Sequence, residues 1–303
     1  MSRVLGIDGG ASSSKWAVLD AAGQVVAQGR AAPIVGHLFN EEMRAQVWVA
    51  LDALLAETSP YAPAAVVAGI TGLDGGTPEA RHFGAHIARA LGLADERVRV
   101  LNDMDLVYRA HFAPGEGVVV YAGTGSVAYS IAPDGAVYRA GGHGYLIGDE
   151  GAGFWIGKTA LRHLLRWHDA GLDTASYPLA RQLYAMLGGR DWPRIRAYVY
   201  GGGRQAVAAL APAVGRAAEE GDETATQVLL QAGRELAELA LTLRHRLGPL
   251  PVVLCGGALQ VSPLIEQGAR ELLEFTVQYA SSAEAAARMA LEILKAEGQS
   301  DAF

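Results

Sequence analysis

A chain of 303 residues is long enough for two domains, and because half of its residues are apolar it can bury a large core, which excludes a disordered protein. The formal net charge of −7 excludes the basic surface typical of nucleic-acid binding, and a single cysteine, Cys255, excludes a disulfide framework or a zinc knuckle. No apolar run has the length of a membrane span, and the segment from Arg3 reads as a strand rather than as a signal peptide. We therefore expect a reduced, soluble, cytoplasmic protein.

Ten strands are predicted from apolar runs bounded by glycine and other turn-forming residues. They are Arg3–Asp8, Lys15–Asp20, Gln24–Gly29, Ala64–Ile70, Val98–Leu101, Gly117–Ala122, Val127–Ala132, Ala136–Ala140, Pro251–Cys255 and Phe275–Gln278. The spacing of apolar residues predicts helices over Glu41–Glu57, Glu79–Leu91, Phe154–Asp169, Glu223–Leu247 and Ala283–Glu297, with another that begins at Pro263. A three-strand meander followed by strand–helix alternation indicates a mixed sheet with helices on its faces.

The opening meander occurs twice, from Val4 and again from Val118, each time with a glycine-rich hairpin tip. Backbone N–H groups at such a tip can cradle a phosphate, because glycine has no Cβ in the way. Two tips, Gly9-Gly10 and Gly123–Gly125, could hold one polyphosphate between two domains, as in a kinase or ATPase without a P-loop. The restart of the meander predicts domains at 1–113 and 114–303, and leaves open whether the C-terminal helix packs on the first domain.

Two carboxylates follow predicted strands. Asp8 stands beside the first tip, where it suits indirect coordination of Mg²⁺; the alternative is an aspartate that caps a hairpin turn. Asn102-Asp103 ends one strand and opens a helix, at the edge where open α/β sheets bind ligands. Asp103 could accept a proton from a substrate hydroxyl, or it could simply be a helix cap, and Asp105 competes for either role.

Two further glycine segments indicate binding loops. The segment Gly141–Gly153 holds many glycines and the pair Asp149-Glu150, whose oxygens could accept hydrogen bonds from sugar hydroxyls; the alternative is a flexible loop with a capping aspartate. In Pro251–Gly257, a strand runs into Gly256-Gly257, which would let the backbone approach a flat ring or a ribose.

Three other features are interpreted as structural. Ala152–Thr159 nearly fits the P-loop pattern, but bulky residues occupy the loop and no buried strand precedes it, so Lys158 is expected on a helix away from phosphate. His82 and His86 have the spacing of metal ligands, without a third ligand, and are interpreted as solvated helix histidines. Cys255 is expected to be a small buried side chain in a strand.

The chain resembles the BadF/BadG/BcrA/BcrD-type ATPases and, within them, the N-acetylglucosamine kinases of the actin, sugar-kinase and heat-shock-chaperone superfamily. The motifs that carry the resemblance run in order along the chain. They are Gly6-Ile-Asp-Gly-Gly-Ala-Ser12, Ala68-Gly-Ile-Thr-Gly-Leu-Asp74, Asn102-Asp103, Ala122-Gly-Thr-Gly-Ser126, the block from Gly141 to Gly157 with its Gly-Asp-Glu-Gly tetrad, and Leu254-Cys-Gly-Gly257. The fold that the resemblance implies is α/β: two actin-like (ribonuclease H-like) domains with a nucleotide cleft between them.

The resemblance also implies a role for particular residues, with ATP and Mg²⁺ as cofactors. The first phosphate loop comprises Asp8, Gly9, Gly10 and Ser12, with Asp8 toward the metal, and the second comprises Gly123, Thr124 and Gly125. The adenosine loop is Gly256 and Gly257, and Asp103 is the catalytic base. The sugar pocket draws on Asp74, Asp103, Gly144, Asp149 and Glu150.

Three positions depart from the family's pattern. Ser13 stands where a Lys or Arg is common, with Lys15 two residues later. The sugar-contacting Asn expected after the first hairpin is absent from Ala31–Leu38, where Gly36-His37 stands instead. His143 replaces a Trp. Whether His37 or His143 supplies the missing contact is left open.

We expect a kinase that phosphorylates an amino sugar or hexose, N-acetylglucosamine or glucosamine at the 6-hydroxyl first among them, with a homodimer as one possible assembly. An alternative is the ATPase activator of a radical 2-hydroxyacyl-CoA dehydratase. Its iron–sulfur cluster needs four thiolates, and one cysteine per chain is too few even in a dimer. A non-catalytic sugar or nucleotide sensor is a further alternative, although Asp8, Asp103 and Asp149 are all present. The same cysteine count excludes the zinc-bearing, repressor-related sugar kinases.

Overall fold

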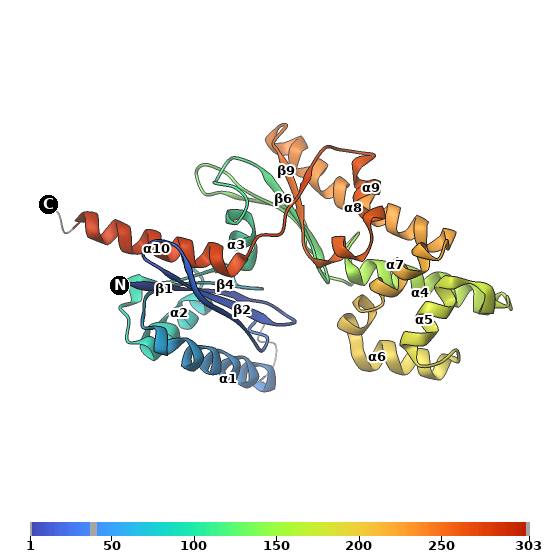
Figure 1. Cartoon of the computed structure of the whole chain (residues 1–303), viewed down its shortest axis with the longest axis horizontal. Helices are drawn as coiled ribbons and strands as arrows, with labels where there is room; N and C mark the ends of the chain where they lie inside the picture. The colour runs from blue at the N-terminus through green and yellow to red at the C-terminus, as the bar shows by residue number, and fades with distance from the viewer. Residues whose placement is uncertain (1, 37–40, 301–303) are drawn as a thin grey trace. The chain divides into compact units, whose positions relative to one another are not determined.

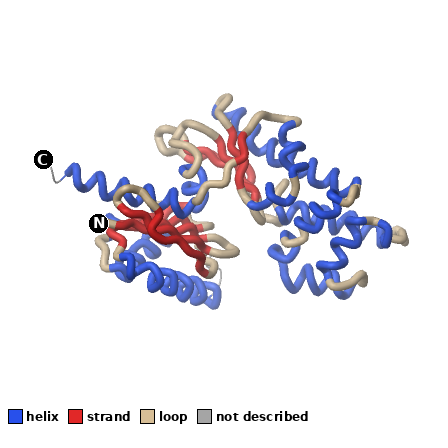
Figure 2. The backbone as a smooth tube through the Cα atoms, in the orientation of Figure 1, coloured by secondary structure: helices blue, strands red, loops and turns tan. Residues whose placement is uncertain are grey.

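The structure is a computed structural model that describes residues 2–36 and 41–300, with side chains through Ala296. The chain divides into two compact units: unit 1 is Met1–Phe112 with Ala280–Phe303, and unit 2 is Ala113–Tyr279. Each unit is built on a five-stranded mixed sheet with helices packed on it (Figure 2). This architecture confirms the α/β fold class expected from the sequence.

Unit 1 begins with the antiparallel meander β1 (Arg3–Gly9), β2 (Ser14–Asp20) and β3 (Val25–Ala31). Two later strands, β4 (Pro63–Ile70) and β5 (Val98–Asn102), run parallel to β1 and give the order β3-β2-β1-β4-β5. The helices of this unit are α1 (Glu41–Thr58), α2 (Pro78–Leu91), α3 (Asp103–Arg109) and α10 (Ser282–Ser300), with short 3-10 turns η1 (Ser59–Tyr61) and η2 (Asp95–Arg97).

Alternation along β1 divides its side chains between the two faces of the sheet. Leu5 and Ile7 are buried in the core that α1 and α2 share, and Val4 is buried in the core under α10. Gly6 stands where α10 crosses the strand, so near that a Cβ would overlap the Ala283 carbonyl and the Ala287 amide. The C-terminal helix therefore packs directly on the sheet of unit 1 (Figure 1).

Unit 2 repeats this connectivity. The meander β6 (Val118–Ala122), β7 (Ser126–Ile131) and β8 (Val137–Gly141) is followed by β9 (Val252–Cys255) and β10 (Thr276–Val277), in the order β10-β9-β6-β7-β8. Its helices are α4 (Gly153–Asp169), α5 (Pro178–Leu187), α6 (Trp192–Ala208), α7 (Ala211–Glu219), α8 (Glu223–Leu247) and α9 (Pro263–Arg270), with the 3-10 turns η3 (Thr174–Ser176) and η4 (Gly257–Val261). The shared strand order confirms the internal repeat predicted from the two hairpins.

Each of the ten predicted strands is present, with ends that differ by at most two residues. Helices α5, α6 and α7 were not predicted from the sequence. In α6 the run Gly201–Gly203 obscures the helical pattern, and Gly203 has non-helical backbone angles of φ 58° and ψ −147°. The core-facing side of α7 is mostly alanine, which gives little contrast with its exposed side. Within the described residues, no helix is both long and apolar enough to cross a membrane.

Candidate active site

The carboxyl ends of three parallel strands meet at one edge of the sheet in unit 1. Their register pairs Gly9 of β1 with Ile70 of β4, and Ile70 with Asn102 of β5. Residues at or just beyond these ends are therefore neighbours, although they are far apart in sequence. This register brings together Asp8, Thr71 and Asp103, of which Asp8 and Asp103 were predicted site residues and Thr71 was not.

Asp103 is held by hydrogen bonds to both of its carboxylate oxygens. The hydroxyl of Thr71 donates to Oδ2 at 2.6 Å, and the amide of Met104 donates to Oδ1 at 3.0 Å. Burial raises the pKa of Asp103 above its ordinary value, while these hydrogen bonds to the charged form oppose the rise. A fixed carboxylate with an increased proton affinity has the properties of a general base.

The cap of α3 is Asn102 rather than Asp103. The side-chain oxygen of Asn102 accepts a hydrogen bond from the Met104 amide at 3.0 Å, and Asp103 is the first residue of the helix. The side-chain amide of Asn102 donates to Leu73 O at 2.9 Å and to Asp74 Oδ1 at 3.3 Å. Asp74, a predicted sugar-pocket residue, is thereby fixed beside the Asn102-Asp103 pair.

Asp8 lies at the end of β1, where its charge is unfavourable. The pKa of Asp8 is raised to about 6. Burial is the largest cause, the positive charge of Lys15 opposes the rise, and the negative charge of Asp103 adds to it. Lys15 is the cross-strand partner of Asp8 in the β1–β2 pair, so its charge acts on Asp8 despite the shift of position from the family pattern. Two carboxylates that disfavour each other's charge form an edge that a bound cation would stabilise.

The first glycine loop is too tight for side chains at two positions. A Cβ on Gly9 would lie 2.9 Å from the Ile34 carbonyl oxygen, and one on Gly10 would lie 2.7 Å from that of Ser13. Ser12, at the tip, is exposed. The loop is therefore free of side chains at Gly9 and Gly10, which a phosphate-binding loop needs for close approach of its backbone.

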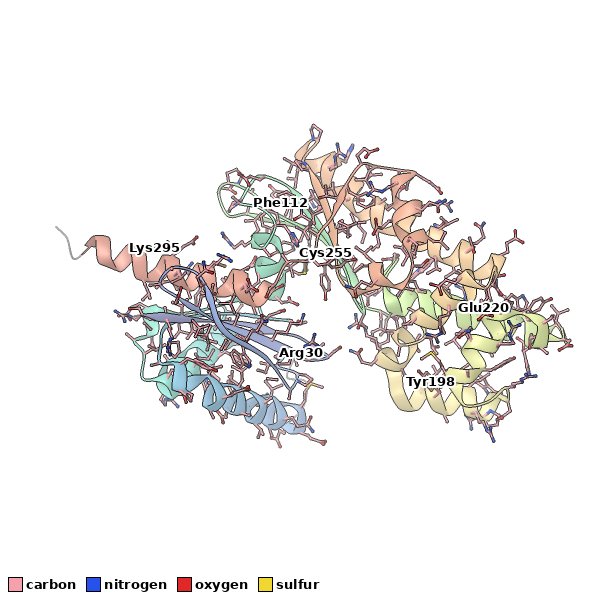
Figure 3. All side chains as sticks on the ribbon, viewed as in Figure 1. Arg30, Phe112, Tyr198, Glu220, Cys255 and Lys295 are labelled. Atoms are coloured by element: carbon pink, nitrogen blue, oxygen red, sulfur yellow. The ribbon has the colours of Figure 1, made fainter. Side chains whose placement is uncertain are left out.

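In unit 2 the second glycine loop and the adenosine loop predicted from the sequence are adjacent. Gly123–Gly125 joins β6 to β7, and Gly256 follows β9, which is parallel to β6. Cys255, labelled in Figure 3, ends β9 and is buried, as predicted; burial raises its thiol pKa to about 12. Gly256 has φ +106°, and a Cβ there would overlap the Ala122 carbonyl oxygen, so only glycine fits between the two strand ends.

Backbone amides at the start of α4 donate hydrogen bonds to carbonyl oxygens of the second glycine loop. The amides of Gly153 and Phe154 donate to Gly123 O at 2.9 Å and to Thr124 O at 3.1 Å, and the Gly123 amide donates to Gly125 O at 2.9 Å. In the part of the chain that the structure describes, the amides of Thr124 and Gly125 are then left without a partner. Backbone amides that have no internal partner are able to donate to an anion.

Sequence comparison identifies the family. The profile of the BadF/BadG/BcrA/BcrD ATPase family matches residues 5–291, nearly the whole chain. The chain belongs to this family.

Known proteins are similar to most of this chain. An N-acetylmuramic acid/N-acetylglucosamine kinase from Clostridium acetobutylicum is 28% identical over 244 residues, covering 78% of this chain and 77% of the relative. A Chromobacterium violaceum structure, provisionally named an N-acetylglucosamine kinase, is 26% identical with a TM-score of 0.75, over 97% of this chain and 99% of that one. A ROK family glucokinase from Streptomyces griseus, solved with glucose and AMPPNP, shares the fold at 15% identity and a TM-score of 0.59, over 96% of this chain and 100% of that one.

The remaining predicted sugar residues of this BadF-type chain lie in the segment before α4. Asp149 has φ +65°, is only 2% exposed, and forms an ion pair in which its Oδ2 lies 2.7 Å from Arg204 Nη2. Its other oxygen accepts a hydrogen bond from the Ser126 amide at 3.3 Å. The carboxylate of Asp149 thus already has partners, whereas Glu150 is half-buried and engages Ser126 through its backbone carbonyl. The expected sugar contacts of Gly144, Asp149 and Glu150 remain predictions.

Of the two histidines considered as substitutes for the missing Asn, only His143 lies in the described part of the chain. His143 is exposed. His37 lies outside the described residues.

The other features interpreted as structural have ordinary contacts. Lys158 lies on α4 with its ammonium 5.5 Å from the centre of the Phe154 ring, and Phe154 is itself part of the helix rather than of a loop. His82 and His86 pack around Trp48, with ring centres at 5.1 Å and 4.8 Å, and His86 Nε2 lies 2.6 Å from an oxygen of Asp52. Lys158 thus lies on a helix, as expected, whereas His82 and His86 pack on an aromatic ring rather than being surrounded by solvent.

Thr71 and Arg204 were not among the site residues predicted from the sequence. Thr71 follows β4 directly, as Asp103 follows β5, so a polar residue at a strand's carboxyl end was the available signal. Arg204 follows the Gly201–Gly203 run, and that run was the only local sign of an unusual backbone.

Proposed function

We propose that this chain is a kinase that transfers the γ-phosphoryl group of ATP to a hydroxyl group of an amino sugar or a hexose. The observation that carries the proposal is the carboxylate of Asp103, fixed by Thr71 and Met104 at the sheet edge that also holds Asp8 and the first glycine loop. The family match and the kinases among the relatives support it.

The residues at this edge fit a nucleotide that carries Mg²⁺. The carboxylates of Asp8 and Asp103 disfavour each other's charge, which a divalent cation would relieve, and Gly9 and Gly10 leave the loop free of side chains. Asp8 would hold Mg²⁺ indirectly, through water, and bound ATP with Mg²⁺ supplies the phosphoryl group with part of its charge neutralised. Backbone amides of Gly10 and Ser12 would donate to phosphoryl oxygens of this nucleotide.

Asp103 would act as the general base. Its carboxylate accepts the proton of the attacking hydroxyl and retains that proton once the hydroxyl oxygen is phosphorylated. The Thr71 and Met104 hydrogen bonds fix the orientation of the carboxylate, and its raised pKa moves its proton affinity toward that of a useful base near neutral pH. Asp74, which accepts a hydrogen bond from Asn102, would accept another from a second sugar hydroxyl.

The sugar that we propose is N-acetylglucosamine or glucosamine, phosphorylated at the 6-hydroxyl. The first of these follows the relatives, one of which is named for N-acetylmuramic acid and N-acetylglucosamine. Glucosamine is included because the segment after the first hairpin lacks the expected acetamide-contacting Asn. The activator of a radical dehydratase is disfavoured further by Cys255, because a buried thiol with a raised pKa is a poor source of thiolate.

A coupled assay of ADP release tests the proposal with glucosamine, N-acetylglucosamine, N-acetylmannosamine, muramic acid and glucose. We expect ADP release that requires both ATP and at least one of these sugars, and formation of the sugar phosphate. Asp103→Asn serves as the control for a contaminating kinase, since it should lose that activity. ADP release that is independent of sugar, or none with any of the five, would contradict the proposal.

A further inference from the structure

Arg204 lies against the second glycine loop. Its Nη2 is 2.7 Å from Asp149 Oδ2, and a Cβ on Gly125 would overlap both that Nη2 and Asp149 Oδ1, with Asp149 Cγ at 2.7 Å. Glycine at position 125 is therefore what lets a guanidinium group and a carboxylate approach the loop backbone. Any side chain at this position would displace one of them.

The guanidinium group has hydrogen-bond donors to spare. Arginine carries five N–H groups, and Arg204 uses one for Asp149. Its Nε is buried and has no partner among the described residues, yet the side chain as a whole is 32% exposed. The ring of Tyr145 lies 5.7 Å from its Cζ and covers one face of the group. A planar, permanently charged group with free donors suits an anion that has several acceptor oxygens.

The break in α6 places two successive side chains on the loop. Gly203 departs from helical geometry, and Arg204 and Gln205 follow it directly. The Thr124 hydroxyl donates to Gln205 Oε1 at 3.3 Å, so the residue next to Arg204 contacts the same loop. The position of the guanidinium group is thus set from two directions, by the helix break and by Asp149.

We propose that Arg204 is an anion-binding residue of the second glycine loop and donates to a phosphoryl oxygen of a nucleotide held by the amides of Thr124 and Gly125. Asp149 is then a positioning residue that fixes the guanidinium group beside the loop. This inference rests on the proposed function, because its ligand is the phosphoryl donor that the proposed kinase uses.

Calorimetric titrations of the full chain with ATP, inorganic tripolyphosphate and adenosine, each in the presence of Mg²⁺, test the inference. Arg204→Gln should weaken binding of ATP and of tripolyphosphate by about tenfold to a hundredfold, the effect of losing one charge-assisted hydrogen bond, and should leave adenosine binding unchanged. The matched control is Arg190→Gln, since Arg190 also stacks on a tyrosine of unit 2, Tyr184, at 5.5 Å from its ring centre. That control should bind all three ligands as the wild type does.

A double variant separates phosphate binding from a purely structural ion pair. Removal of Arg204 alone leaves the buried carboxylate of Asp149 without its partner, which can perturb the loop indirectly. Asp149→Asn combined with Arg204→Gln removes that charge and keeps the fold, as circular dichroism would verify. If Arg204 binds phosphate, the double variant remains weak toward tripolyphosphate. Recovery of wild-type affinity, or an equal loss of adenosine binding in Arg204→Gln, would overturn the inference.

The outcome is distinguishable from a failure of the proposed function. Weakened tripolyphosphate binding in Arg204→Gln, in a protein that phosphorylates none of the sugars, would uphold the phosphate ligand and refute the sugar kinase. Unchanged tripolyphosphate binding in a protein that does phosphorylate a sugar would refute the role of Arg204 alone.

Discussion

The charge of Asp8 should destabilise the free protein, and Asp8→Asn should relieve that cost. The folded pKa is about 6, against an ordinary value of 3.8, because burial disfavours the carboxylate. A group whose folded pKa is raised binds protons more tightly in the folded state. Protonated Asp8 therefore contributes to the free energy of unfolding; this contribution is fully present below pH 3.8 and is lost as the pH rises through about 6.

The magnitude follows from the two pKa values. At about 1.4 kcal/mol per pH unit, the difference between 3.8 and about 6 corresponds to about 3 kcal/mol. The free energy of unfolding of Asp8→Asn, minus that of the wild type, should therefore increase by up to about 3 kcal/mol between pH 4 and pH 8. The same variant should lose phosphoryl transfer, since Asp8 is proposed to hold Mg²⁺.

Urea denaturation followed by circular dichroism, with both proteins measured side by side at each pH, gives this difference directly. Asp134→Asn is the control, because Asp134 is an exposed turn residue whose oxygen accepts a hydrogen bond from Ala136. The stability difference of the control from the wild type should stay small across the range. A difference for Asp8→Asn that is constant with pH, or that decreases as the pH rises, would refute the assigned burial of this charge.

Three further predictions concern the base, the near-match to a P-loop and the substrate. Thr71→Val removes a hydrogen bond to the charged form of Asp103, so the acidic limb of kcat/KM should move to higher pH, while Thr71→Ser should keep the wild-type profile. Lys158→Ala should keep turnover within a few fold, because this ammonium lies over the Phe154 ring. Glucosamine or glucose should be used comparably to N-acetylglucosamine, as measured by kcat/KM, because the acetamide-contacting Asn is missing.

Each of these has a contradicting outcome. If the acidic limb of kcat/KM in Thr71→Val stayed at its wild-type pH, Thr71 would not influence the pKa of the general base. Complete loss of turnover in a folded Lys158→Ala protein would restore the P-loop interpretation. A ratio of kcat/KM above about a thousand in favour of N-acetylglucosamine would show strict reading of the acetamide group.

The fold was predictable because the pattern that specifies it is local. Strands in both sheets are apolar runs that end in glycine or polar residues, and the repeat of the meander in the sequence indicated that the unit is repeated in the fold. The same logic located Asp8 and Asp103, since both directly follow or end a strand whose direction the pattern implies. The break in α6 was not predictable, because a glycine run is compatible with a loop as well as with a helix, and only the structure shows that Gly203 alone departs from helical backbone angles within Trp192–Ala208.

The site residues that could not be predicted are those whose contacts are with residues distant in sequence. Thr71 matters because the register of β4 against β1 and β5 brings its hydroxyl to Asp103, and no spacing in the sequence encodes that register. Arg204 matters because Gly125 leaves room for it, which depends on how α6 folds back onto the hairpin. The pairing of Asp149 with Arg204 likewise changes the interpretation of a carboxylate that the glycine block alone had suggested as a sugar ligand.

The turnover of Asp103→Asn tests the central claim most directly. Asparagine keeps the size of the side chain but cannot accept the proton of the sugar hydroxyl. We predict a loss of kcat of about 10²–10⁴-fold, the usual contribution of a general base, with ATP affinity by calorimetry nearly unchanged. Asp105→Asn, the neighbouring carboxylate on the same helix, should retain most of its turnover. Wild-type turnover in Asp103→Asn, or the large loss in Asp105→Asn instead, would contradict the account.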